Sequence, residues 1–188
     1  MFLVDTSDST TRDQLKNILE LIKTQASSYS IDNKAAKIAV VTYGSSPSTV
    51  LNFDDASSFG DVVKGLYSIS LTGGKADLPK ALNHVNQEVI PRARKDKPTI
   101  VSVFTTKNPD FTEEQDLKTA KDRLENRLVK IMVTSLDPSG ITRPLDDLTN
   151  VVDGNLFPKN PDDLTPLLPA VIDATKRAQG MWKNSLDS

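Results

Sequence analysis

The stretch Phe2-Leu3-Val4-Asp5-Thr6-Ser7-Asp8-Ser9 joins a strand-like apolar run to a turn rich in side-chain oxygens. A helical pattern follows from residue 11, so Asp5 stands at the exit of a buried strand. The hydroxyls of Ser7 and Ser9 come two and four residues later. Mg²⁺ prefers hard oxygen ligands with one or two carboxylates among them, and the turn therefore predicts a metal site. The alternative from these residues alone is that they cap the next helix.

Outward from this turn, apolar runs rich in β-branched residues alternate with longer segments of helical period. This alternation predicts βαβ units and a mainly parallel sheet. Strands are expected at residues 2–4, 38–43, 99–104 and 129–134, with weaker ones at 48–53 and 155–157. Turn formers at 44–47 predict a hairpin and hence one antiparallel edge strand. The expected fold class is α/β: a doubly wound, Rossmann-like, six-stranded sheet with helices on both faces.

Six segments carry apolar residues at helical spacing. Helices are expected at residues 11–28, 58–66, 77–89, 112–127, 144–150 and 162–178. Thr112, with Gln115 three residues later, has the pattern of a capping box. A chain of 188 residues suffices for one domain with a full core, which we assign to residues 1–179. Residues 180–188 are expected to form a tail or linker.

Composition excludes several classes of function. The formal net charge of −2 gives no basic footprint for a nucleic acid. The longest apolar runs are strand-sized, so direct membrane insertion is not expected. The chain has no cysteine and one histidine, His84, which leaves no thiolate site and no histidine pair for zinc.

The Asp5-x-Ser7-x-Ser9 motif and the order of elements resemble the von Willebrand factor type A domain. In that family, a threonine before the third helix and an aspartate after the fourth strand complete a metal-ion-dependent adhesion site. Ala76 and Thr106 stand at those two positions here. The resemblance thus implies a degenerate site that binds Mg²⁺ or another divalent cation weakly. Its implied ligands are Asp5, Ser7 and Ser9, with partial compensation by Asp77 and Thr106.

The resemblance also implies a non-enzymatic adhesion module, secreted into the extracellular matrix or part of a cell-adhesion protein. Its partner would be a protein such as collagen or another matrix component. A structural spacer or self-assembly domain is the alternative. Less favoured is a Mg²⁺-dependent phosphohydrolase, which needs a carboxylate where Ser7 stands. A Ser-His-Asp hydrolase would depend on His84, and no G-x-S-x-G motif is present.

A basic cluster follows one predicted helix end. It comprises Arg92, Arg94, Lys95 and Lys97. Interaction with the negative end of the helix dipole is the simpler explanation. A contact patch for a polyanion or glycosaminoglycan is the alternative.

Overall fold

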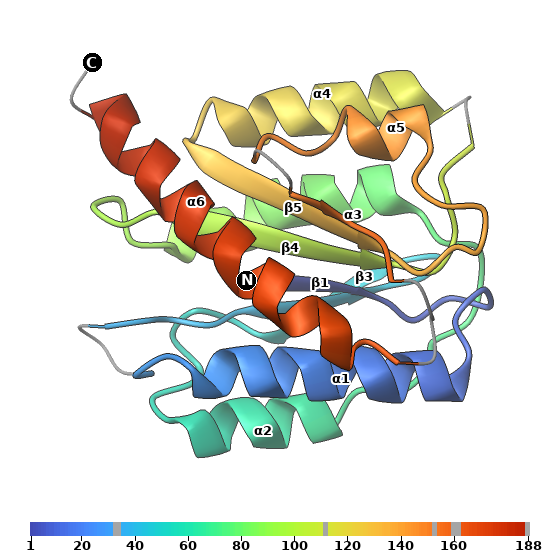
Figure 1. Cartoon of the computed structure of the whole chain (residues 1–188), viewed down its shortest axis with the longest axis horizontal. Helices are drawn as coiled ribbons and strands as arrows, with labels where there is room; N and C mark the ends of the chain where they lie inside the picture. The colour runs from blue at the N-terminus through green and yellow to red at the C-terminus, as the bar shows by residue number, and fades with distance from the viewer. Residues whose placement is uncertain (32–34, 111–112, 152–153, 159–162, 187–188) are drawn as a thin grey trace.

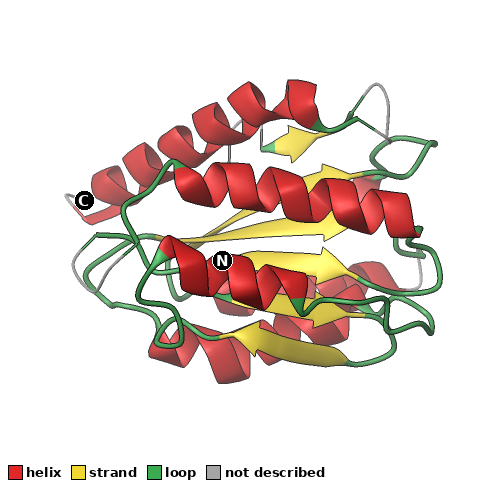
Figure 2. Ribbon diagram, turned by 90° about the horizontal axis from the view of Figure 1, so that it is seen from below, coloured by secondary structure: helices red, strands yellow, loops and turns green. Residues whose placement is uncertain are grey.

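A six-stranded sheet runs through the middle of the molecule (Figures 1 and 2). The computed structural model describes residues 1–31, 35–110, 113–151, 154–158 and 163–186. Its strands are β1 Phe2–Asp5, β2 Val40–Tyr43, β3 Pro47–Leu51, β4 Thr99–Thr105, β5 Val129–Ser135 and β6 Asn155–Leu156. The order is β3-β2-β1-β4-β5-β6, and β3 is antiparallel to β2 whereas the other neighbours are parallel. The predicted fold class is confirmed.

Helices cover both faces of the sheet. They are α1 Arg12–Ser27, α2 Phe59–Tyr67, α3 Leu78–His84, α4 Glu114–Glu125, α5 Arg143–Asp146 and α6 Leu168–Leu186. A π-helical turn, Val85–Val89, and a 3-10 turn, Ile90–Arg92, continue α3. Helices α1, α2 and α6 share one hydrophobic core, and α3, α4 and α5 share the other.

The central strand β1 contributes to both cores. Side chains alternate between the two faces of a strand, so Phe2 and Val4 enter the core under α1 while Leu3 enters the core under α3. All four β1 residues are buried. An uninterrupted buried strand of this kind is expected where helices cover both faces of a parallel sheet.

One helix prediction lies partly outside the described residues, and two others need correction. The structure describes α4 only from Glu114, and its N-cap Glu113 makes no side-chain cap hydrogen bond. The predicted capping box falls on Thr112, which lies outside the described residues. The helix expected at 144–150 is the single turn Arg143–Asp146, because the segment turns at residues 147–148 to lead towards β6.

The last helix was also placed wrongly. A 3-10 turn, Thr165–Leu167, precedes α6, which continues from Leu168 through Gly180 to Leu186. One glycine costs a helix only about 1 kcal/mol relative to alanine, which does not suffice to end it. Most of the segment expected as a tail or linker is therefore helical.

Chain order reverses between β1 and β4. The chain passes from β1 to β2 and β3 on one side, and fills the other side with β4, β5 and β6. Ligands of doubly wound sheets bind at such a reversal, beyond the carboxyl ends of the strands. Asp5 ends β1 at this point, on the right of the sheet in Figure 1.

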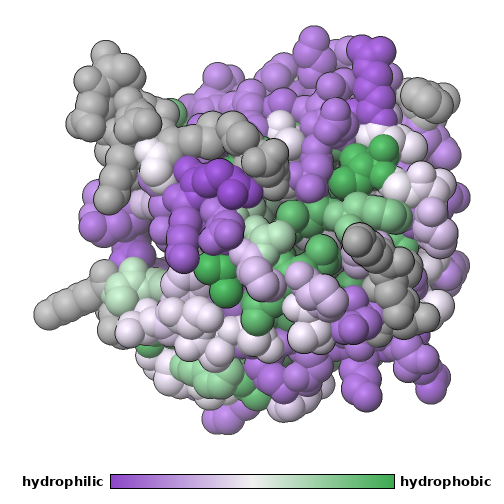
Figure 3. All heavy atoms as spheres, viewed as in Figure 1, coloured by the Kyte–Doolittle hydropathy of each residue, from purple (hydrophilic) through white to green (hydrophobic). Residues whose placement is uncertain are grey.

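Surface polarity on the face that carries α6 is mixed. Figure 3 shows hydrophobic side chains in the middle of this face and hydrophilic ones along its margins.

In the described part of the chain, no helix combines the length and the apolar character that crossing a membrane requires.

Gly65 provides a test of how α2 packs on the sheet edge. A Cβ at this position would lie 2.4 Å from Cδ1 of Leu51 on β3. We expect Gly65→Ala to destabilise the protein by about 1–3 kcal/mol, because overpacking forces neighbouring groups to move. Gly60→Ala is the matched control in the same helix, since the nearest atom to its Cβ lies 3.6 Å away. Urea denaturation measures both; equal stability of the two variants would contradict the packing described.

Candidate functional site

Asp5 is the centre of a polar cluster at the carboxyl edge of the sheet. Its side chain is completely buried, with 0% exposure. Oδ1 accepts a hydrogen bond from the backbone N–H of Ser7 at 2.9 Å. Oδ2 accepts two from Thr106, one from the backbone N–H at 3.1 Å and one from the hydroxyl at 2.9 Å. The exits of β1 and β4 are thus joined through a single carboxylate.

Further hydroxyl groups extend this cluster away from Asp5. The Oγ atoms of Ser7 and Ser9 lie 2.7 Å apart, and Ser9 Oγ lies 3.1 Å from Thr106 Oγ1. Thr10 Oγ1 lies 2.9 Å from Thr106 Oγ1, and its hydroxyl donates to the Asp5 carbonyl at 3.3 Å. We call these five residues, Asp5, Ser7, Ser9, Thr10 and Thr106, the Asp5 cluster. Four of its members were predicted site residues.

Thr10 was missed by the sequence reasoning. It lies just before the N-cap Thr11, whose hydroxyl accepts from the Gln14 N–H in a complete capping box. The only signal was the concentration of hydroxyl residues at 6–11, where all but Asp8 are serine or threonine. The Thr11 side chain therefore caps α1, whereas the side chain of its neighbour Thr10 joins the Asp5 cluster.

Asp77 has a different place from the other predicted residues. Its Oδ1 accepts from the backbone N–H of Lys80 at 3.0 Å, so the side chain caps α3. Its own backbone N–H donates to the Gly44 carbonyl at 3.1 Å. The hydrogen bonds of Asp77 therefore place it at the start of α3, and none of them joins it to the described Asp5 cluster.

A second set of contacts holds the loop at residues 71–77 against the first turn. Thr6 Oγ1 lies 2.8 Å from Thr72 Oγ1, and the Thr6 carbonyl accepts from the N–H groups of Thr72 and Gly73. Gly73 and Gly74 adopt φ values of +74° and +78°, in the left-handed region that glycine tolerates. This contact between Thr6 and Thr72 was not predicted, because 66 residues separate the two threonines.

Tyr43 lies beside Asp5 on the neighbouring strand and is fully buried. Burial, together with the charge of Asp5, raises the pKa of the Tyr43 phenol well above its usual range. The phenol therefore stays protonated and donates to the Phe104 carbonyl at 3.3 Å. An uncharged phenol held by this hydrogen bond therefore lies next to Asp5.

Lys75 connects the same loop to the start of α4. Its Nζ lies 3.0 Å from Glu113 and 3.2 Å from Asp110. The hydrogen bond to Glu113, followed by that to Asp110, raises the pKa of Lys75. Because Lys75 is exposed, these ion pairs contribute little to stability. Their effect is to place an ammonium group beside Ala76 on the outer surface.

The donor atoms of the Asp5 cluster suit a hard cation in type but supply little charge. Asp5 is its one carboxylate, and both carboxylate oxygens already accept hydrogen bonds from the protein. Among the described residues, no group of three or more histidine, cysteine, aspartate or glutamate side chains is placed to hold a metal ion. Mg²⁺ gives up its waters reluctantly, so a site with one carboxylate and several hydroxyls would bind it weakly.

His84 lies at the end of α3 and contacts β3. Its Nε2 lies 2.8 Å from Thr49 Oγ1. This position separates the single histidine from the Asp5 cluster, so the described residues do not assemble the Ser-His-Asp arrangement considered above.

Comparison with known proteins places this geometry in context. The family model of the von Willebrand factor type A domain matches residues 1–162. One similar structure is that of proximal thread matrix protein 1 (PTMP1) from the mussel byssus, with zinc in its metal-ion-dependent adhesion site (MIDAS) motif. It matches this chain with a TM-score of 0.82 and 16% sequence identity. A second crystal form of PTMP1 has a TM-score of 0.78 and 19% identity. Manganese-loaded TRAP protein of Plasmodium vivax has a TM-score of 0.71 and 16% identity.

These structural matches cover nearly all of this chain. The two PTMP1 structures cover 93% of it, and the TRAP structure covers 91%. In return, this chain covers 44% and 46% of the two PTMP1 chains and 70% of the TRAP chain. It therefore spans less than half the length of PTMP1. At these identities the likeness shows the fold.

Thr106→Val tests whether the Asp5 cluster stabilises the fold. The valine keeps the side-chain shape but removes the hydroxyl that donates to Asp5 Oδ2. We expect a loss of about 1–3 kcal/mol, because a buried carboxylate loses a hydrogen-bond donor. Urea denaturation would measure it. Thr106→Ser retains the hydroxyl and should recover most of the stability.

Thr119→Val is the matched control, since it removes a hydroxyl that bonds to the Gln115 carbonyl on the surface of α4. If Thr106→Val were no more destabilising than Thr119→Val, the Asp5 cluster would not have the structural role described.

Proposed function

The chain belongs to the von Willebrand factor type A family, and from that premise we propose that it is a non-enzymatic protein-binding module whose binding does not require a tightly held metal ion. Domains of this family generally mediate protein–protein interactions. The observation that carries the proposal is the hydrogen bonding of Asp5: the buried carboxylate is satisfied by Ser7 and Thr106. The first turn is therefore ordered by the protein's own donors.

A divalent cation remains part of the proposal as a weak ligand. Asp5, Ser7 and Ser9 would hold it, with Thr106 contributing a hydroxyl instead of a second carboxylate. Asp77 would contribute only by leaving its cap position on α3. Such a cation would supply positive charge to an acidic group of the partner, while the protein residues hold the turn in place. PTMP1 with zinc and TRAP with manganese are metal-containing relatives in fold.

The proposed contact surface is the loop edge around the Asp5 cluster. Asp8 is exposed there, and its backbone N–H donates to the Gly74 carbonyl at 3.0 Å, which holds the two loops together. Lys75 lies on the neighbouring loop with 66% of its side chain exposed. Asp8 and Lys75, the latter paired with Asp110 and Glu113, give the edge charges of both signs on an ordered backbone, which suits a polar protein partner.

We propose a matrix protein as the partner, with collagen as the first candidate, and an extracellular location. PTMP1 is a thread matrix protein by name, which supports this class of environment. Because this chain matches under half of PTMP1, the activity of the whole relative does not transfer directly.

A structural spacer or self-assembly domain is the second candidate. The continuation of α6 to Leu186 favours it, since the helix extends past Ala178, its last described core residue. This function predicts contacts through the side faces and the ends of the chain instead of the loop edge.

Surface plasmon resonance on immobilised fibrillar collagen tests the first candidate. We expect binding that changes less than about twofold between EDTA and Mg²⁺, because the protein's own donors order the turn. Asp8→Lys with Lys75→Glu should weaken it about tenfold or more by reversing both exposed charges. Lys64→Glu on α2 is the control for altered charge elsewhere.

Three outcomes would contradict the proposal. Binding that disappears in EDTA would show that a metal ion is required. Binding that the loop-edge variant leaves unchanged would favour the structural candidate. Absence of binding in both buffers would remove collagen as the partner.

A further inference from the structure

A basic hollow lies at the end of the sheet opposite the Asp5 cluster, where β4 and β5 begin. Its volume is about 280 Å³. Among its described lining residues are four cationic side chains and no carboxylate: Arg94, Lys95, Lys97 and Arg127. This concentration of one charge is unexpected on a chain whose formal net charge is −2.

Helix dipoles do not account for the whole cluster. The helical run that continues α3 ends at Arg92, and Ala93 already has extended backbone angles of φ −70° and ψ 153°. Lys95 and Lys97 come three and five residues after that end. The influence of a helix dipole falls off within the last turn, so these two lysines lie beyond it. Arg127, two residues after α4, is the member that the dipole explains best.

The ion pair that Lys97 makes among the described residues compensates little of its charge. Lys97 Nζ lies 3.8 Å from Asp96, and both side chains are more than half exposed, so the attraction is weak. Arg94 has a structural contact, because its Nη2 donates to the Ala35 carbonyl at 2.6 Å. This bond fixes Arg94 between two segments, while Lys95, Lys97 and Arg127 are exposed around it.

Apolar side chains complete the hollow. Ile90 and Pro91 line it from the α3 side and Leu128 from the α4 side. Leu128 has a left-handed φ of 58° and remains 44% exposed as the chain turns into β5. Cations beside apolar edges match a ligand that carries anionic groups on rings with C–H faces. Sugar rings bearing sulfate groups have this chemistry.

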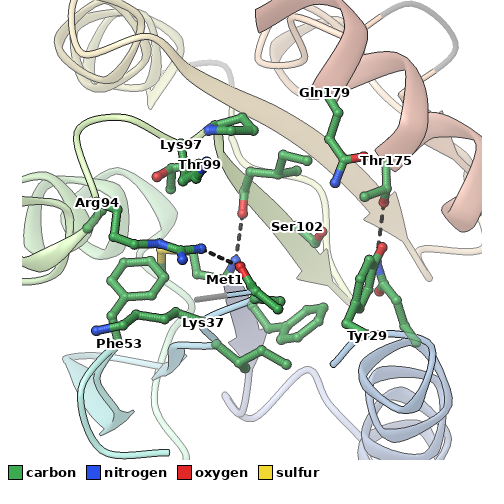
Figure 4. A pocket seen from close by; sticks show the side chains of 18 residues that line it. Met1, Tyr29, Lys37, Phe53, Arg94, Lys97, Thr99, Ser102, Thr175 and Gln179 are labelled. Atoms are coloured by element: carbon green, nitrogen blue, oxygen red, sulfur yellow. Dashed lines mark hydrogen bonds between the residues drawn. The ribbon is translucent and has the colours of Figure 1, made fainter. Parts of the chain in front are cut away.

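A second hollow of about 260 Å³ adjoins the first (Figure 4). Arg94 and Lys97 line both hollows, and Lys37 adds a further cation to the second. Figure 4 shows three cations around this space: Arg94 and Lys97 from the loop before β4, and Lys37 from the segment before β2. Lys37 is paired with Asp54 at 2.5 Å, so its charge is partly compensated. Two adjoining hollows that share cations suit a linear ligand better than a single small anion.

We propose that these hollows bind a sulfated polysaccharide, with Lys95, Lys97 and Arg127 as its main contacts. Single-stranded nucleic acids are bound largely by stacking on aromatic side chains. The large exposed aromatic residues in the described chain are Phe59, Tyr67 and Phe157, and none of them lines either hollow. The aromatic residues that do line the second hollow are buried or half-buried: Phe2, Tyr29 and Phe53. The proposal does not depend on the protein-binding function assigned to the loop edge.

Isothermal titration with heparin tests this proposal, using the whole chain at about 50 mM and about 300 mM NaCl, since salt screens exposed charges. We expect binding at the lower salt that weakens at the higher salt. The variant Lys95→Glu/Lys97→Glu/Arg127→Glu should bind about tenfold more weakly or worse, because three exposed attractions become repulsions. All three positions are exposed, and urea denaturation would verify that the variant folds.

The matched control is Lys16→Glu/Lys64→Glu/Lys118→Glu, which makes the same change in net charge at exposed positions on α1, α2 and α4. It should keep heparin affinity within about threefold, because the screened charges lie away from the hollow. Hyaluronan, which carries no sulfate, and a short single-stranded DNA are the comparison ligands, and both should bind more weakly than heparin.

Absence of heparin binding by the unmodified chain at low salt would overturn the proposal. Equal losses in the two triple variants would also overturn it, because they would indicate a general effect of net charge. DNA binding as tight as heparin binding would overturn the assignment to a sulfated polysaccharide.

Discussion

The bond between the Asp5 carboxylate and Thr106 is the constraint on which the rest of this edge depends. A buried carboxylate must find hydrogen-bond donors, and Asp5 has no exposed surface through which water would supply them. Thr106 supplies two donors and Ser7 one. Satisfying this one charge therefore fixes the exits of β1 and β4 relative to each other, at the reversal of strand order.

Hydrogen bonds attach the loop before α3 to the turn that follows Asp5. Thr6 holds Thr72, and Asp8 holds Gly74, so the loop before α3 follows the position of the first turn. Close approach is possible because Gly44 has no side chain: a Cβ there would lie 2.4 Å from the Gly73 carbonyl oxygen. Hydroxyl and amide donors thus hold the first turn and the loop before α3 in place. A metal ion with more charged ligands would otherwise have this role.

Much of this arrangement was predictable from local patterns. Buried strands with continuous apolar residues identified the sheet, and the hairpin turn identified its antiparallel edge. Asp5, Ser7 and Ser9 were predictable because they share one turn, and Thr106 because parallel strands bring their carboxyl ends to one edge. Long-range pairs had no such signal: Thr6 with Thr72 depends on how two loops meet. Asp77 was predicted to contribute to the site, but its side chain caps α3 instead. Backbone direction, which the sequence does not reveal, decides between these two positions.

Helix ends were predicted less well than helix positions, because their causes compete. The last helix was expected to end at residue 178, yet the cost of one glycine is small and α6 continues through Gly180. The basic residues after α3 had two explanations in the sequence. The structure separates them by position, since Arg92 lies in the last helical turn while Lys95 and Lys97 lie past it.

Calorimetric titration with Mn²⁺ tests most directly the claim that protein donors have taken over the role of a tightly bound cation. The unmodified chain should bind no more tightly than about millimolar, because a single carboxylate offers too little charge. Ala76→Thr/Thr106→Asp restores a hydroxyl and a carboxylate, and it should bind at least about tenfold more tightly. Micromolar binding by the unmodified chain that disappears in Asp5→Asn would contradict the account.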